Sequence, residues 1–150
     1  MLASRTYTLG STRILDCDGI ACIALSGILT AATIRELKTH TCALADDDPV
    51  VIADWSGVVI ADTAAALVEA ITGDGQHVMR QPVALVVTLA QVPVVRQFAR
   101  LMTARGLSRP VFLTRVDAAA WCRRELAIRL DESLHQARYR GQSGGSLRSG

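Results

Sequence analysis

The side chains best suited to chemistry lie close together between Asp54 and Thr63. Asp54 and Asp62 supply carboxylates, while Ser56 and Thr63 supply hydroxyl groups. Thr63 opens a helix in the expected pattern, and a helix N-terminus gathers unpaired backbone N–H groups and the positive end of the helix dipole. A phosphate on a hydroxyl at that place is well stabilised. The layout therefore indicates a phosphorylation switch more than a catalytic centre.

A strand, a polar corner and a helix are expected to position these groups. Val50–Ala53 predicts a buried strand, and a helix is predicted from about Thr63 to Thr72. At the corner between them, Asp54 is expected to accept hydrogen bonds from backbone N–H groups near Ser56. Trp55 has two open interpretations, as a contact for a partner or as cover for the end of the sheet.

Strand and helix signals alternate along the rest of the chain. Two short strands, 13–17 and 20–26, flank an Asp18-Gly19 hairpin turn, and Thr30 is a good N-cap for the first helix. The apolar run 82–89 is typical of a strand covered on both faces. The remaining signals predict a helix from Pro93 that ends at Gly106, a strand over 111–114 and a helix capped by Asp117.

The resulting order, β-β-α-β-α-β-α-β-α, predicts a single α/β domain with a mixed sheet of four or five strands, flanked by four helices. We expect this domain to cover residues 5–128. Leucines at 126, 130 and 134 extend the last helix over 129–140, about three turns beyond a compact domain. Residues 141–150 contain four Gly and three Ser and predict a disordered tail.

Composition narrows the function classes. A net charge of +2 is too small to indicate nucleic acid as a partner, and the apolar runs are too short to span a bilayer. With no charged-then-apolar leader, the expectation is a cytoplasmic protein. HExxH, P-loop and GxGxxG patterns are absent from the sequence, so we expect no enzyme and no cofactor.

The cysteines do not have the spacing of a metal site. There is no CxxC motif, and the three histidines are scattered, so we expect no bound metal. Buried thiols in a reducing cytosol are the simplest interpretation. Redox control is the alternative that remains open for Cys17, Cys22, Cys42 and Cys122.

Three segments together resemble the STAS domain, the family of bacterial anti-sigma factor antagonists and of cytoplasmic domains of sulfate transporters. Leu25–Thr33, LSGILTAAT, is similar to the family's LxGxLDxxT, with Thr30 in place of Asp. Asp54–Thr63, DWSGVVIADT, is similar to DLSGVxFIDS. Phe112 followed by Asp117–Trp121 is similar to the closing strand and the EAxxWL helix. These segments span most of residues 8–126 in the family's order.

The resemblance implies a STAS-like fold with an extended C-terminal helix and a protein partner, an anti-sigma factor or a serine-threonine kinase of that type. It implies a binding face built from Thr30, Asp54, Trp55, Ser56 and the Asp62-Thr63-Ala64 segment. Many antagonists carry Asp-Ser-Ser/Thr-Gly, whereas this chain has Asp-Thr-Ala-Ala. If the residue directly after Asp in this motif is the one phosphorylated, Thr63 can accept the phosphate. If the next residue is the one phosphorylated, Ala64 stands there and cannot accept it.

The expected function is therefore a regulatory protein–protein interaction module of the anti-sigma factor antagonist type, switched by phosphorylation at Thr63. One alternative is a phosphorylation-dead scaffold or oligomerisation module, with a homodimer formed through the C-terminal helix. Another is a domain that binds a small ligand or a lipid between the sheet and the Thr63 helix. A large apolar cavity favours the ligand-binding alternative, while exposed apolar residues near Trp55 to Val59 favour an interface.

Overall fold

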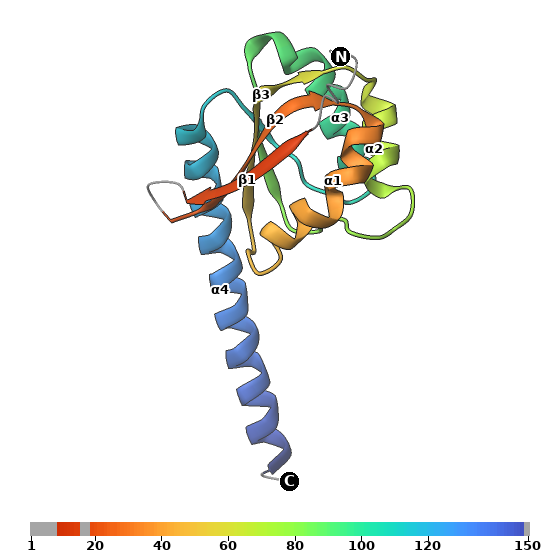
Figure 1. Cartoon of the computed structure of the whole chain (residues 1–150). Helices are drawn as coiled ribbons and strands as arrows, with labels where there is room; N and C mark the ends of the chain where they lie inside the picture. Colours follow the sequence, from red (N-terminus) through yellow and green to blue (C-terminus); the bar gives the residue numbers. More distant parts are fainter. Residues whose placement is uncertain (1–8, 16–18, 149–150) are drawn as a thin grey trace, which may run out of the picture.

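The computed structural model describes residues 9–15 and 19–148 (Figure 1). Cys17 and the first residue of the expected Asp18-Gly19 turn lie outside the described residues, as do residues 5–8 of the expected domain and the last two residues of the expected tail. The five strands are β1 (Gly10–Leu15), β2 (Ala21–Leu29), β3 (Val51–Ile60), β4 (Val83–Val86) and β5 (Val111–Phe112). The helices are α1 (Ala31–Leu44), α2 (Ala64–Thr72), η2 (Leu89–Gln91, a 3₁₀ turn), α3 (Val92–Ala104) and α4 (Arg115–Arg148).

The strands form one mixed sheet in the order β1-β2-β3-β4-β5. β1 pairs antiparallel with β2, and each later strand pairs parallel with the one before it. Parallel neighbours require a crossover, and right-handed crossovers that advance in one direction place their helices on the same face. α1, α2 and α3 accordingly cover one face of the sheet, and α4 packs on the other (Figure 1).

Two hydrophobic clusters follow from this arrangement. The larger lies between the sheet and α1–α3 and includes Trp55, Leu67 and Phe98. The smaller lies under α4 and includes Ile52, Ala118 and Cys122. Because the central strands are buried on both sides, β4 is apolar at every position, as the sequence predicts. The expected α/β fold with a mixed sheet, four helices and a long last helix is confirmed.

The structure corrects one expected element boundary. β3 does not end at Ala53 but continues to Ile60, through the segment expected to be a polar corner. The pairing with β2 slips there, because Ala24 pairs with Asp54 whereas Ser26 pairs with Gly57. Two residues of β3, Trp55 and Ser56, therefore lie opposite one residue of β2. This is a β-bulge, which bends the strand without ending it.

The C-terminal region also differs from its expectation. α4 begins at Arg115, two residues before the expected cap Asp117, and its backbone remains helical to Arg148. The Gly- and Ser-rich composition predicts a disordered tail from 141. Extending an existing helix by one residue costs less free energy than nucleating a new helix. Residues with poor helix propensity therefore become helical more readily at the end of an existing helix than on their own. The helix projects away from the sheet, and residues 127–140 are exposed on all sides (Figure 1).

Candidate functional site

The N-termini of α1 and α2 meet at the carboxyl ends of two neighbouring strands. Leu29 and Ile60 are the last paired residues of β2 and β3, and the Ala61 N–H donates to the Leu29 carbonyl at 3.0 Å. Thr30, the cap of α1, directly follows β2, and Thr63, the cap of α2, lies three residues after the end of β3. Two sets of unpaired helical N–H groups are therefore collected at one edge of the domain.

Thr30 closes the start of α1 with a reciprocal pair of hydrogen bonds. Its hydroxyl accepts from the Thr33 N–H at 3.2 Å, and its own N–H donates to the Thr33 hydroxyl at 2.8 Å. This is a capping box with Thr in place of the usual Glu or Gln. Thr30 thus has the N-cap role that the sequence predicts for it.

Asp62 ties the two helix starts together. One carboxylate oxygen accepts from the Ala31 N–H of α1 at 2.9 Å, and the other accepts from the Thr63 N–H at 2.9 Å. The bond from Ala31 and then the bond from Thr63 hold the pKa of Asp62 below its usual range. A negative charge at both helix N-termini is also favoured by their dipoles. Asp62 is therefore a shared anionic cap.

Thr63 places its hydroxyl at the exposed start of α2. The side chain is exposed, and its Oγ1 accepts from the Ala66 N–H at 3.1 Å. The next residue, Ala64, is only 2% exposed and packs into the core. Of these two adjacent positions, only Thr63 presents its side chain to solvent.

Asp54 and Ser56 lie apart from the helix caps, near α4. Asp54 accepts from the backbone N–H of Ser56 at 2.9 Å and from its hydroxyl at 2.5 Å, which confirms the expected local role of this carboxylate. Arg115, at the start of α4, contacts the second carboxylate oxygen at 2.7 Å. Burial raises the pKa of Asp54, but the Ser56 and Arg115 bonds outweigh it and hold this pKa below its usual value. The group links β3 to α4.

Trp55 is a buried core residue, which accounts for it structurally and gives no support to the partner-contact interpretation. Its side chain is on the α1–α3 face and is 5% exposed, with its ring 5.0 Å from that of Phe98 between centroids. The physical reason is strand alternation, since Trp55 follows Asp54 and must point to the opposite face. Gln91 reinforces the bulge by donating to the backbone carbonyls of Trp55 and Val58, both at 2.9 Å.

The expected binding residues therefore form two groups and not one face. Thr30, Asp62 and Thr63 lie together at the helix starts, with Ala64 buried behind them. Asp54 and Ser56 lie on the α4 side of β3. Sequence reasoning missed Arg115 and Gln91, which are distant in the chain from β3. The one local signal is at Gln91, whose side chain accepts from the Thr88 N–H three residues earlier in a capping pattern.

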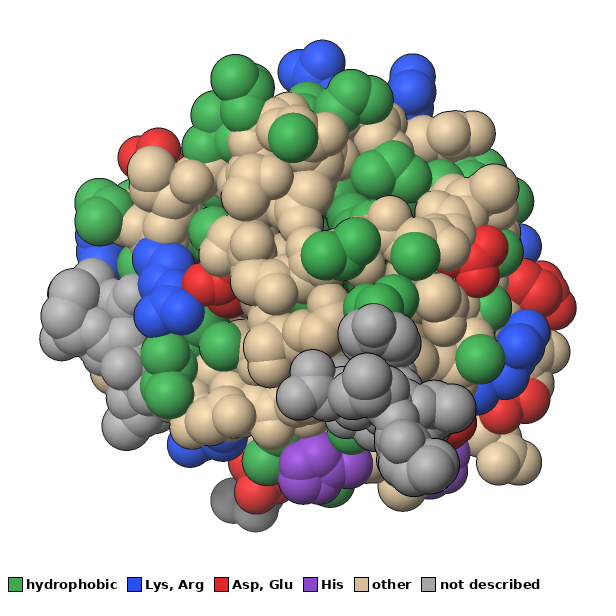
Figure 2. Space-filling model, turned by 45° about the horizontal axis from the view of Figure 1, so that its top comes forward, with side chains coloured by type: hydrophobic (Ala, Val, Ile, Leu, Met, Phe, Trp, Pro, Cys, Tyr) green, Lys and Arg blue, Asp and Glu red, His purple; other side chains and the backbone are tan. Residues whose placement is uncertain are grey.

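Exposed apolar side chains follow the carboxyl ends of the parallel strands. Val59 is 64% exposed, whereas Trp55 and Val58 are buried, so of the apolar residues expected to be exposed near Trp55 to Val59 only Val59 reaches the surface. Leu89 after β4, Leu113 after β5 and Val116 in the first turn of α4 are also exposed. Figure 2 shows hydrophobic side chains reaching the surface among uncharged atoms, with most charged groups toward the edges of the view.

Other site classes find no support among the described residues. No group of three or more His, Cys, Asp or Glu side chains in 9–15 and 19–148 is arranged to hold a metal ion. The Cys22 and Cys122 side chains are buried, and Cys42 is partly exposed. None of the described helices is both long and apolar enough to cross a membrane.

Comparison with known proteins supports the fold. No protein-family model and no curated protein matches the sequence. Among solved structures, an anti-sigma factor antagonist from Mycobacterium paratuberculosis is similar, with a TM-score of 0.53 and 19% identity over 77% of this chain and 95% of that one. An uncharacterised DUF3478 protein with a SpoIIAA-like fold from Shewanella loihica PV-4 has a TM-score of 0.50 and 13% identity over 79% of this chain and 96% of that one. The chain has a STAS-like fold.

Proposed function

We propose that this chain is a regulatory protein–protein interaction module of the anti-sigma factor antagonist type, switched by phosphorylation of Thr63. The observation that carries the proposal is the exposed Thr63 hydroxyl at the start of α2, beside a carboxylate that caps both α1 and α2. The solved anti-sigma factor antagonist of similar fold supports the class of function.

The helix start is chemically suited to carry a phosphate. Phosphorylation adds a charge of about −1.5 to −2 and three acceptor oxygens, which the N-terminus of α2 stabilises. The added charge stands directly next to Asp62, whose carboxylate already occupies the Ala31 and Thr63 N–H groups. Repulsion between the two anions changes the charge and the shape of this edge, while the buried core behind Ala64 remains intact. The consequence is altered partner binding without unfolding.

The proposed partner is an anti-sigma factor, which in this type of system is also a serine-threonine kinase. The unmodified edge formed by Thr30, Asp62 and Thr63 docks the partner and thereby frees a sigma factor; phosphorylation weakens that complex. Exposed Val59 and Leu89 supply apolar area near the carboxyl ends of the strands. The proposal places the protein in the cytoplasm and assigns it no catalytic step.

A phosphotransfer assay read by mass spectrometry tests the switch. The purified chain, Thr63→Ala and Thr30→Ala are incubated with ATP and anti-sigma-type kinases. Thr30 is a matched control because it is also a helix N-cap threonine. We expect a phosphate-sized mass gain in the wild type and Thr30→Ala, mapped to Thr63, and none in Thr63→Ala. No gain with any kinase, or a gain mapped elsewhere, would contradict the phosphorylation switch and favour the scaffold.

A second candidate, an oligomerisation module, is favoured by the exposed extension of α4. Leu130 and Leu134 are 64% and 52% exposed, and with Leu126 they recur every four residues, which places them along one side of the helix. A second copy of the chain would cover this row in a homodimer. Sedimentation of the wild type and of a Leu130→Lys, Leu134→Lys variant tests it, since a dimer that the double variant abolishes would support this contact.

A further inference from the structure

The core on the α1–α3 side encloses a cavity of about 100 Å³. Its walls are mostly apolar and include Ala53 and Trp55 from β3, Phe98 and Met102 from α3, and Ile34 from α1. Most protein cores have few voids larger than a water molecule, and an engineered apolar cavity of about 150 Å³ stays dry and binds benzene. The space is therefore large enough to receive a small apolar group.

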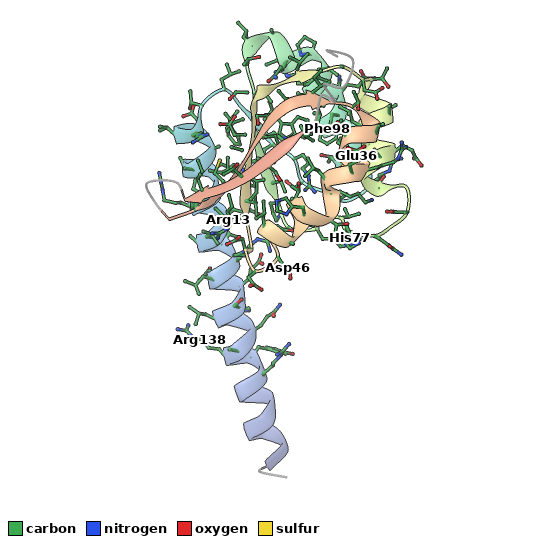
Figure 3. The ribbon with its side chains drawn as sticks, viewed as in Figure 1. Arg13, Glu36, Asp46, His77, Phe98 and Arg138 are labelled. Atoms are coloured by element: carbon green, nitrogen blue, oxygen red, sulfur yellow. The ribbon has the colours of Figure 1, made fainter. Side chains whose placement is uncertain are left out.

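The cavity has a mouth away from the Thr63 edge. Partly exposed Lys38, Thr41 and Cys42 from the second half of α1 line it, together with exposed His77 from the loop after α2. The Cys42 thiol donates to the His77 carbonyl at 2.7 Å, which links α1 to that loop. Figure 3 labels Phe98 in the interior and His77 at the loop, two residues of the cavity wall.

Arg109 places a buried positive charge in this wall. The residue is 5% exposed and lines the cavity. Burial lowers its pKa to about 10, so it is charged at neutral pH. Its three hydrogen bonds go to backbone carbonyls, those of Met79, Gln81 and Ser108. Among the described residues, no carboxylate forms an ion pair with it, whereas the nearby Lys38 is paired with Asp74 at 2.7 Å.

These bonds leave part of the guanidinium's donor capacity unused. Nη1 donates to Gln81 and Ser108, and Nη2 donates once, to Met79. A guanidinium has five N–H donors, so the Nε–H and one Nη2–H donate to no described residue. A carboxylate is the acceptor with which a guanidinium forms its strongest, charge-assisted hydrogen bonds.

From this charge and these walls we infer that the cavity binds a small amphiphilic acid, a carboxylate with a short hydrocarbon chain. The carboxylate pairs with Arg109 near the mouth, and the chain extends inward toward Phe98. The complementarity is both electrostatic and apolar, since an unpaired buried cation favours an anion and a dry cavity favours a hydrocarbon. This site is independent of the Thr63 switch, so either proposal can fail alone.

Calorimetric titration of the wild-type chain with octanoate and with octanol tests the inference. The two probes share a hydrocarbon chain and differ in charge. We expect saturable one-to-one binding of octanoate, with octanol weaker by at least about tenfold because it lacks the charged pair. Equal affinities would overturn the inference by making the cavity a plain apolar void with a structural arginine. Absence of octanoate binding would overturn it too.

Two variants locate the site. Ala53→Val adds bulk to the cavity wall and is expected to reduce the affinity for both probes at least about threefold by overpacking. Arg109→Gln removes the charge and is expected to reduce octanoate binding alone, while Arg105→Gln, at an exposed arginine, leaves both unchanged. If Arg109→Gln does not fold, the difference between octanoate and octanol binding in the wild type, and the reduced binding of both in Ala53→Val, still test the site. Unchanged octanoate affinity in both the Ala53 and Arg109 variants would overturn the assignment of the site.

Discussion

The two ends of the α1–α3 layer treat charge in opposite ways. At the helix starts, the Asp62 carboxylate accepts two backbone N–H groups at 2.9 Å, one on each oxygen. At the cavity, the Arg109 guanidinium is more deeply buried yet meets only carbonyl dipoles among the described residues. In our proposals, the first end is switched by an anion that is added covalently. The second end binds an anion that arrives by diffusion.

The comparison also separates structural from functional polar groups. Asp54 accepts hydrogen bonds from Ser56 and Arg115, and it links β3 to α4 and faces neither end. These hydrogen bonds explain the conformation and the charge of the Asp54 side chain without any ligand. Arg109 differs because its three hydrogen bonds use only some of the five N–H groups of its guanidinium. The following tests begin with the largest expected effect.

Replacing Arg109 with Met should destabilise the fold by about 2 kcal/mol or more, because the Met79 and Gln81 carbonyls lose the Arg109 donor and each unsatisfied group costs about 1–3 kcal/mol. The Ser108 carbonyl keeps the Val83 N–H as a donor. Urea unfolding at pH 7 measures the loss. Arg105→Met is the control, since that exposed guanidinium makes one bond of 3.5 Å. A change for Arg109→Met as small as the control's would show that the buried cation is not integral to the fold.

Introducing charge at Thr63 should weaken partner binding by at least about tenfold, or 1.4 kcal/mol. Thr63→Glu mimics the modification and adds an anion beside Asp62, while Thr63→Ala removes the cap without adding charge. Titration of each variant with an anti-sigma factor measures affinity. Similar binding by Thr63→Glu and Thr63→Ala would mean that charge at this edge does not control the complex.

Acid should destabilise the folded chain through Asp62 and Asp54. Both pKa values lie below the ordinary 3.8 in the folded state, so these groups contribute stability above about pH 4, which is lost as the pH falls through their folded pKa values. Urea midpoints at pH 7, 5 and 3 measure this. Asp62→Asn should flatten the fall between pH 5 and 3. An equally steep fall in this variant would show that Asp62 does not favour the folded state.

Removing residues 129–150 should have the smallest effect, a change below about 0.5 kcal/mol in the free energy of unfolding. The described side chains of 129–140 are exposed, so the domain loses no buried contact there. Thermal unfolding of the chain ending at residue 128 measures it. A large drop in Tm would mean that the extension stabilises the domain, for instance by pairing two copies.

Much of the fold follows from local patterns. The caps Thr30 and Thr63 were predictable because an N-cap bonds to N–H groups three residues ahead. The order of strands and helices followed from apolar periodicity. The β-bulge could not be predicted from such patterns, because Asp54-Trp55-Ser56-Gly57 has the composition of a turn. This segment remains a strand because it pairs with β2. That pairing sets the faces of Asp54 and Trp55.

The sequence alone determined the α/β order and the two threonine caps, since each depends on neighbours within a few residues. Only the tertiary structure decided that Asp62 bridges two helices, that Arg115 reaches Asp54 across 61 positions, and that Arg109 lies in the wall of a cavity. The physical reason is that burial and ion pairing depend on which elements pack together. Residues distant in the chain carry no local signal of that packing.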